Sequence, residues 1–422
     1  MRTQLARGFV LAAVLALVAA CSNSGGSSAP ATSATSAAPS AAGSAAGSPA
    51  GSAPASGGTI KIGGGFALTG DESALDLPAA NGAKLAVKEI NAAGGINGSQ
   101  IDFIVHDSQY KMDVTAQTAK QFVEQDKVPL MIGYTDTDSV LASGPTFQSA
   151  GIPFITVGAT SPKIPTQVGD MMFLACFGDN VQAAVGAEYS YETFGHNAYF
   201  LWDKGIEYTT LLGEYFKARF TELGGTIALE DSYADDATDF SAQITKIKAD
   251  NADTLFLTTA VEQITLVMKQ AQEQRLTRKV VTTGGSSSPT QLIKQAGAAA
   301  EGSYHIVFFM PWFPEAMPDG KLAKAFVDEW AKRGHPFEGL TEGFRGHDGI
   351  ATIAEAIRVA GKDDPKAVQE ALWKVSLMGV NGPIKFEKDG PAGKESGQSK
   401  PSIFVVQIRD GKVALPDFLA KK

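Results

Sequence analysis

The sequence is poor in cysteine, with two in 422 residues, and this scarcity excludes several kinds of fold and site. Cys21 lies at the end of the N-terminal export segment, so Cys176 has no partner in the remainder of the chain. A disulfide framework and a cysteine-based metal site are therefore excluded. We expect Cys176 to be a small residue of the hydrophobic core.

The sequence also lacks the motifs of common enzyme classes. Gly63-Gly64-Gly65 begins a dinucleotide fingerprint, but Leu68 occupies the position of its last glycine. Neither a Walker A motif nor a G-x-S-x-G elbow is present. The five histidines are scattered without ligand spacing, and the His347-Asp348 pair favours a structural role over a metal site. We therefore expect no enzyme activity, no cofactor and no metal.

An excess of positive charge is also absent. The formal net charge is -9 and the isoelectric point is near 5.2, which argues against a nucleic-acid-binding surface. Hydrophobic residues make up 44% and charged residues 19% of the chain, as in soluble globular proteins. A length of 422 residues allows more than one domain with a sizeable core.

The only long apolar run lies near the N-terminus. Arg2 and Arg7 precede the apolar residues 9–18, a pattern typical of an export signal over residues 1–20 and too short for a comfortable membrane span. The segment ends in Leu-Val-Ala-Ala-Cys21, which resembles the lipobox of bacterial lipoproteins. The resemblance implies cleavage before Cys21 and its lipidation; an ordinary secretory signal is the alternative. Residues 21–58, rich in Ser, Ala, Gly and Pro, are expected to be a flexible tether.

From residue 59 onwards, strand and helix patterns alternate, which predicts a mostly parallel sheet with helices on both faces. In the first series we expect strands at 59–66, 101–106 and 129–134, and helices at 79–92, 114–125 and 140–149. The series then restarts with helices at 182–194, 209–223, 240–250 and 262–274 and strands at 198–202, 226–232, 254–258 and 279–283. Further strands are expected at 303–309, 384–387 and 403–408, and helices at 321–332, 349–360 and 365–374. Two successive series indicate two lobes.

Residues 152–162 (IPFITVGATSP) are the stretch most suggestive of a ligand site. An apolar strand is followed by small and hydroxyl-bearing residues. In open α/β sheets ligands bind beyond the carboxyl ends of strands, where such residues expose backbone amides and hydroxyls. Taken alone, the pattern is more typical of a strand followed by a polar turn, and the rest of the chain is what favours a ligand site.

Several segments in this order resemble the periplasmic binding proteins of branched-chain amino-acid ABC importers, the Leu/Ile/Val-binding type. The likeness spans residues 59–408 and is carried by INAAGGING at 90–98, Ile132-Gly133, the GATSP loop, Trp202-Asp203-Lys204 with Tyr208, Asp239-Phe240-Ser241, and residues 280–285. The resemblance implies two Rossmann-like α/β lobes joined by three crossover strands, with a ligand cleft between them. The first lobe would comprise 59–177 and 310–380, and the second 178–309 and 381–422. The chain would cross between lobes near 177–179, 308–310 and 379–383.

The resemblance also implies which residues touch the ligand. In the first lobe, where the family holds a ligand carboxylate, these are Thr137, Asp138 and Ser139 on one loop, and Gly158, Ala159 and Thr160 on the other. In the second lobe they are Tyr208, Trp202 and Ser286, although Trp202 is equally typical of a core residue.

Three features depart from the family's pattern. The loop at 135–139 carries Asp136 and Asp138, which would repel a ligand carboxylate if they faced the cleft; alternatively either aspartate caps the following helix. Residues 284–288 contain no acid to pair with a ligand ammonium, so Glu207 or Glu262 would have to replace it. Leu75 also stands where the family carries an aromatic side chain.

These patterns predict a membrane-anchored extracytoplasmic receptor of an ABC importer. It would bind an amino acid or a related small polar solute by lobe closure, act as a monomer, and present the solute to a membrane permease. The alternative is a receptor for an amide, urea or an aromatic acid that serves sensing instead of uptake. A purely structural surface lipoprotein is a third class.

Overall fold

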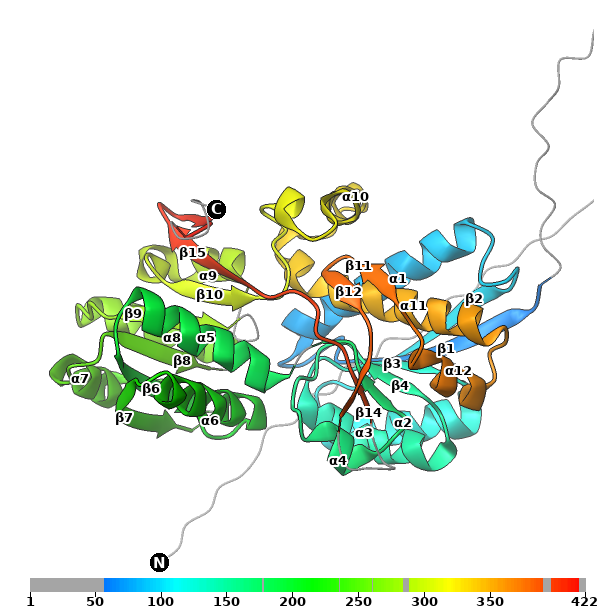
Figure 1. Ribbon diagram of the computed structural model, residues 1–422, viewed down its shortest axis with the longest axis horizontal. Coiled ribbons are helices and arrows are strands. Elements are labelled where there is room, and N and C mark those ends of the chain that lie inside the picture. Colours follow the sequence, from blue (N-terminus) through cyan, green and yellow to red (C-terminus); the bar gives the residue numbers. More distant parts are fainter. Residues whose placement is uncertain are drawn as a thin grey trace, which may run out of the picture. The chain divides into compact units, whose positions relative to one another are not determined.

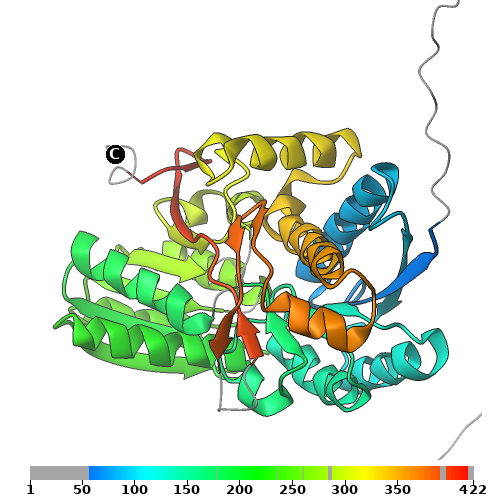
Figure 2. The same ribbon diagram turned by 45° about the vertical axis from the view of Figure 1, so that its right-hand side comes forward.

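The computed structural model describes residues 57–416 apart from 177, 235, 260, 284–287 and 390–395. Within this part the chain forms two seven-stranded sheets, each with helices on both faces, and one short hairpin (Figures 1 and 2). The expected fold of two Rossmann-like lobes is therefore confirmed. None of the described helices combines the length and the hydrophobicity that a membrane span requires.

The first sheet is parallel except at one edge, where its last two strands pair antiparallel. Its order is β2 (Gln100–Asp107), β1 (Thr59–Phe66), β3 (Met131–Gly133), β4 (Phe154–Thr156), β5 (Met172–Leu174), β14 (Ser396–Gln398) and β13 (Glu387–Asp389). Helices α1 (Ser73–Ala92), α11 (Leu340–Ala360) and α12 (Pro365–Leu372) cover one face. The other face carries α2 (Met112–Gln121), which continues as the π-helix η1 (Phe122–Asp126), and α3 (Thr137–Ala150) with α4 (Ile164–Val168). We call this unit, with α10 (Gly320–Lys332), the first lobe.

The second sheet repeats the same strand order through its first five members. It runs β7 (Thr226–Tyr233), β6 (Asn197–Asp203), β8 (Thr254–Thr258), β9 (Lys279–Thr283), β10 (Tyr304–Val307), β15 (Phe404–Arg409) and β16 (Lys412–Ala414). Helices α5 (Asp179–Thr193) and α6 (Glu207–Glu222) cover one face. Helices α7 (Ser241–Ala249), α8 (Val261–Glu273) and α9 (Pro289–Ala296) cover the other. This unit is the second lobe.

Strand periodicity places alternate side chains in the two helical layers. In β6, Tyr199 and Leu201 join the core under α7 and α8, whereas Ala198 and Phe200 join the core under α5 and α6. A strand buried on both faces needs apolar residues at every position, which is why these strands read as continuous apolar runs.

The chain passes between the sheets three times, but the last passage is not where the sequence predicted it. The first two passages lie between β5 and α5 and after β10, as expected. Residues 377–384 instead form a hairpin of β11 (Leu377–Gly379) and β12 (Gly382–Ile384), and β13 and β14 then join the first sheet. The third passage is therefore at 399–403. The assignment of β13 and β14 to the second lobe was wrong, because β13 pairs with β14, and β14 pairs in parallel with β5 of the first sheet.

Helix α11 begins at Leu340, nine residues before the expected start at 349. Its first half contains Gly343 and Gly346, which lower helix propensity and conceal the helical pattern. Both glycines lie against α1: a Cβ on Gly346 would be 1.8 Å from the carbonyl oxygen of Ala79, and one on Gly82 would be 1.7 Å from that of Gly343. The two helices thus pack backbone to backbone, and only glycine fits there.

Candidate functional site

A cavity lies where the two lobes face each other, at the point in each sheet where strand order reverses. About 660 Å³ of space, partly open to solvent, is enclosed by the ends of β1, β3 and β4 in the first lobe and of β6 and β8 in the second. Such reversal points are where open α/β sheets hold ligands. The lining residues are Glu72, Leu75, Tyr110, Thr135, Asp136, Thr137, Asp138, Gly158, Thr160, Ile206, Tyr208, Thr209, Thr259, Phe308, Glu342 and Arg345.

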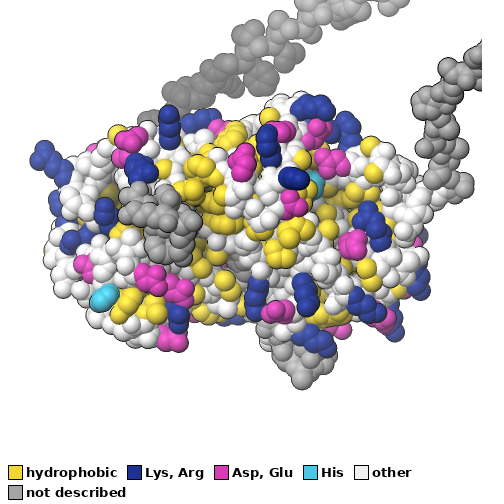
Figure 3. All heavy atoms as spheres, turned by 45° about the horizontal axis from the view of Figure 1, so that its top comes forward, with side chains coloured by type: hydrophobic (Ala, Val, Ile, Leu, Met, Phe, Trp, Pro, Cys, Tyr) yellow, Lys and Arg dark blue, Asp and Glu magenta, His cyan; other side chains and the backbone are white. Residues whose placement is uncertain are grey.

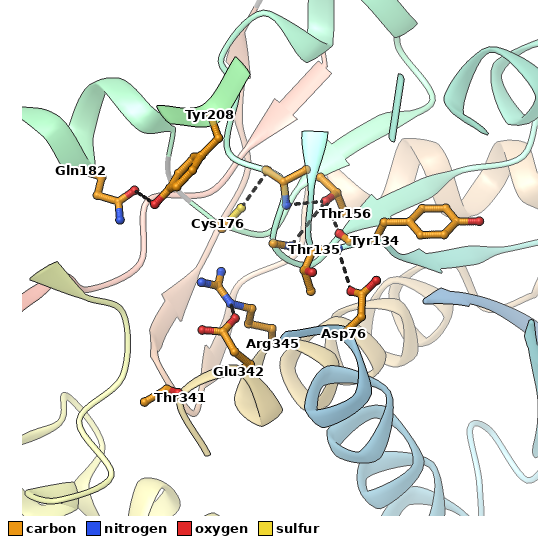
Figure 4. A network of polar contacts seen from close by, with 12 residues as sticks. Asp76, Tyr134, Thr135, Thr156, Cys176, Gln182, Tyr208, Thr341, Glu342 and Arg345 are labelled. Atoms are coloured by element: carbon orange, nitrogen blue, oxygen red, sulfur yellow. Dashed lines mark hydrogen bonds and ion pairs between the residues drawn. The ribbon is translucent and has the colours of Figure 1, made fainter. Parts of the chain in front are cut away.

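Buried hydrogen bonds connect the loops of the first-lobe wall. The Asp76 carboxylate of α1 accepts from the amides of Ala67 (2.6 Å) and Thr135 (3.1 Å), which follow β1 and β3. The Thr156 hydroxyl at the end of β4 donates to the Tyr134 carbonyl (2.9 Å) and accepts from the Ala159 amide (3.0 Å). Figure 4 shows the part of this network that joins Asp76 to Thr135 and Thr156 to Tyr134. Side chains thus position the loops that carry Thr135 and Gly158.

Gly158 is required by the close approach of those two loops. A Cβ at this position would lie 2.7 Å from the Cα of Thr135. Next to it, the Cys176 thiol donates to the Ala159 carbonyl (3.2 Å), and burial raises the pKa of this thiol to about 12. Cys176 is accordingly an inert, buried thiol.

The two aspartates that departed from the family pattern both line the cavity, and one of them also caps a helix. Asp136 is the N-cap of α3, and its Oδ1 accepts from the Ser139 amide at 2.7 Å. Burial raises the pKa of Asp136 to about 7, and the neighbouring charge of Asp76 acts in the same direction. Burial also raises the pKa of Asp138. Asp136 therefore fulfils both alternatives, since it faces the cavity and caps the following helix.

A buried ion pair forms another part of the wall. Arg345 and Glu342, one helical turn apart on α11, are 5% and 6% exposed in their side chains, and Arg345 Nε donates to Glu342 Oε2. The Arg345 guanidinium also lies over the Phe308 ring, 4.3 Å from its centroid. Burial raises the pKa of Glu342, and the charge of Arg345 opposes that effect.

The second-lobe wall is neutral among its described residues. Tyr208, in the first turn of α6, has its hydroxyl hydrogen-bonded to Gln182 Oε1 (3.1 Å) and Thr283 Oγ1 (3.0 Å). Burial raises the pKa of Tyr208 beyond its ordinary value. Ile206, Thr209 and Thr259 complete this wall.

Contacts between the lobes flank the cavity. Lys163 Nζ, just before α4, lies 3.9 Å from Glu207 Oε1 in the first turn of α6. Glu207 is not among the residues that line the cavity. Lys294 of α9 pairs with Glu338 in the 3-10 turn η4 (Phe337–Gly339). Trp312 Nε1 donates to Thr290 Oγ1 at 2.8 Å. A change in lobe separation would break these contacts.

The structure brings most of the predicted ligand residues together. Thr137, Asp138, Gly158, Thr160 and Tyr208 line the cavity. Ser139 and Ala159 are buried behind it and hold the loops through their backbone amides.

Trp202 is not among the lining residues: it stacks on Phe200 with ring centroids 4.7 Å apart, in the core under α6. Outside the described residues lie Ser286, the side chain of Glu262, the expected export signal, Cys21 with its expected lipidation, and residues 21–56 of the expected tether.

Several lining residues were missed by sequence reasoning. Tyr110 follows β2 with a positive φ of 53°, Glu72 precedes α1, and Thr259 follows β8. Tyr110 and Thr259 come soon after a strand end, and that position was the available signal for these two residues. Arg345 and Glu342 were missed because the helix that carries them was expected to begin later.

Asp179 is a buried carboxylate whose replacement should reveal a pH dependence of stability. It is fully buried, neither of its oxygens has a hydrogen-bond partner among the described residues, and burial raises its pKa to about 7, although the Thr160 hydroxyl lies near enough to oppose the shift. The folded protein therefore keeps a proton on Asp179 that the unfolded chain releases near pH 4. The free energy of unfolding accordingly falls as the pH rises from 4 to 7.

We expect Asp179→Asn to match the parent near pH 4 and to be more stable than the parent by about 1–3 kcal/mol at pH 8. Urea denaturation at the two pH values measures the difference, and Asp113→Asn, on the exposed first turn of α2, is the control. Equal stability of Asp179→Asn and parent at pH 8 would contradict the assignment.

Within the described part of the chain, no three His, Cys, Asp or Glu side chains are grouped to hold a metal. The chemistry that the cavity offers is recognition by hydroxyls, carboxylates, one guanidinium and aromatic rings.

Comparison with known proteins agrees with this geometry. The periplasmic binding protein family model matches residues 59–412. An amino acid binding protein of Pseudomonas aeruginosa is 27% identical over 334 residues, which cover 78% of this chain and 85% of the relative.

Two solved structures resemble the chain over nearly their whole length. The leucine binding protein LivK of Thermotoga maritima superposes with a TM-score of 0.74 and 25% identity, covering 85% of this chain and 97% of that one. The branched-chain amino acid transporter substrate binding protein LivJ of Streptococcus pneumoniae, solved with isoleucine, gives 0.75 and 25%, covering 84% and 97%. With its two lobes, its cavity at both reversal points and a family match over residues 59–412, this chain belongs to the periplasmic binding protein family.

Proposed function

We propose that this chain is the solute-binding receptor of an ABC importer. It captures an amino acid or a related small polar solute between its lobes and delivers the solute to a membrane permease. The observation that carries the proposal is the cavity lined from both lobes at the two reversal points. A solute that touches both walls favours the closed form by its differential affinity for that form.

A receptor of this family works outside the cytoplasm. We propose that a lipid on Cys21 holds this receptor at the membrane, and that the 21–58 tether lets the folded body move relative to the membrane surface. We propose that it acts as a monomer. On the face drawn in Figure 3, acidic and basic side chains are interspersed and do not form a single-sign patch, which supports a role without nucleic acid.

Isothermal titration of the purified protein tests the proposal. We expect saturable binding of one solute per chain from a panel of amino acids, amides, urea and aromatic acids. Trp312 gives an independent signal, because its hydrogen bond to Thr290 joins the lobes and its fluorescence should change on closure. Absence of binding by every solute of the panel would overturn the proposal and favour a structural lipoprotein.

Thr160→Ala is expected to weaken binding of the solute about five- to tenfold, the effect of losing one hydrogen bond of about 1 kcal/mol. Thr160 lines the cavity on the loop after β4 and is 4% exposed. Thr221→Ala, at the exposed end of α6, and shortening of the 21–58 tether should leave the affinity unchanged. Equal affinities of Thr160→Ala and Thr221→Ala would remove Thr160 from the site.

A further inference from the structure

The charge of the cavity lining is strongly unbalanced. Its charged members, all contributed by the first lobe, are the carboxylates of Glu72, Asp136, Asp138 and Glu342 and the single guanidinium of Arg345. Since Glu342 already neutralises Arg345, the lining as a whole carries an excess of negative charge. The described second-lobe residues add none. An anionic or neutral apolar solute would leave this excess uncompensated in a partly desolvated space.

The N-terminus of α3, where the family's resemblance places a ligand carboxylate, is already occupied by a carboxylate of the protein. Asp136 Oδ1 accepts from the Ser139 amide, and Asp136 Oδ2 is buried without a hydrogen-bond partner among the described residues. A second carboxylate would meet like charge here, whereas a solute N–H⁺ would satisfy the orphaned Oδ2. Beside it, the Thr137 hydroxyl, on a residue only 4% exposed, also has no partner among the described residues.

Arg345, in contrast, requires a hydrogen-bond acceptor. Its Nε is used by Glu342 and its guanidinium is held over Phe308, but its Nη1 is buried without a partner in the described part of the chain. A buried guanidinium N–H calls for an acceptor oxygen, and Arg345 lines the same cavity as the aspartates. Figure 4 shows the Arg345 head group between α11 and the second-lobe residue Tyr208.

We propose that the solute of this receptor carries a cationic group several bonds away from an acceptor oxygen, the chemistry of a basic amino acid with its side-chain cation and its carboxylate. Its cation lies against Glu72, Asp136 and Asp138, and its carboxylate or carbonyl oxygen accepts from Arg345 Nη1. The anion therefore sits on α11 and the cation at the start of α3, the reverse of the polarity that the family resemblance implied. This inference rests on the proposed function and names the solute class of the same cavity.

Three probes of matched length test it by isothermal titration. Lysine carries both groups, norleucine lacks the terminal cation, and cadaverine lacks the carboxylate. We expect lysine to bind at least tenfold more tightly than norleucine and more tightly than cadaverine. Norleucine, leucine or benzoate binding as tightly as lysine would overturn the inference while leaving the proposed function intact. If no small solute of any charge binds, the proposed function fails as well.

Variants of the cavity aspartates locate the cation. Asp138→Asn should lose at least tenfold in lysine affinity, and Asp136→Asn should lose as much while keeping its cap, since asparagine also caps helices. Asp113→Asn, exposed on α2, is the charge-matched control, and thermal denaturation verifies that each variant is folded. Lysine affinities of Asp138→Asn and Asp136→Asn equal to that of Asp113→Asn would overturn the proposal.

Discussion

Replacing Arg345 with alanine is expected to lower the free energy of unfolding by about 3–5 kcal/mol, because it leaves the Glu342 carboxylate buried without its cation. Both side chains are almost fully buried, at 5% and 6% exposure, so each charge depends on the other for its stabilisation. Burial already raises the pKa of Glu342, and the charge of Arg345 is what opposes that shift. Urea denaturation followed by circular dichroism at pH 7 measures the change.

Arg358→Ala on the same helix is the matched control for this experiment. Arg358 pairs with Glu355 at 3.3 Å, but the two side chains are 43% and 30% exposed, so we expect a loss below about 1 kcal/mol. The double variant Arg345→Met, Glu342→Leu removes both charges at similar volume and should recover most of the stability. A loss for Arg345→Ala no larger than that for Arg358→Ala would contradict the account of the buried pair.

Gly346→Ala is expected to destabilise the first lobe by about 3 kcal/mol, the upper part of the usual range for overpacking. The added Cβ would lie 1.8 Å from the Ala79 carbonyl oxygen and 2.9 Å from the Ala83 amide nitrogen, which are backbone atoms of α1 that cannot rotate away. The expected loss of about 3 kcal/mol already includes the gain of about 1 kcal/mol in helix propensity when alanine replaces glycine. Thermal denaturation and urea titration give the loss.

Gly82→Ala should behave in the same way, since its Cβ would meet the Gly343 carbonyl oxygen at 1.7 Å. Gly58→Ala is the control, because no atom lies within 4 Å of the place that its methyl group would take. Arg345 and Glu342 lie on the stretch of α11 that would be displaced, so solute affinity should fall together with stability. Parent-like stability of both helical variants would show that α1 and α11 are not in backbone contact.

The sequence was sufficient for the alternation of strands and helices, since apolar periodicity reports directly on which residues face a core. It was also sufficient for the loops after β3 and β4, where Asp138 and Thr160 line the cavity. These residues follow strand ends, and that position is visible in a sequence.

The predictions that were wrong concern features that are determined by contacts between residues far apart in the sequence. The glycines of α11 look like helix breakers until α1 is placed against them. Trp202 at a strand end resembles a ligand-stacking residue until Phe200 is found stacked on it. The short strand β14 has no apolar run to reveal it, and its pairing with β5 moves the third passage between lobes to 399–403. Periodicity carries no information on any of these pairings.

The hydrogen bonds from Asp76 and Thr156 to the loops after β1, β3 and β4 have a consequence for selectivity. Because those bonds join groups of the protein to one another and need no solute atom, capture does not have to order this wall, and little affinity is lost to its rigidification. Differences in affinity among solutes then depend on how well the shape of each solute lets the neutral wall that carries Tyr208 and Thr209 close against it. The receptor would therefore discriminate by shape at one wall and by charge at the other.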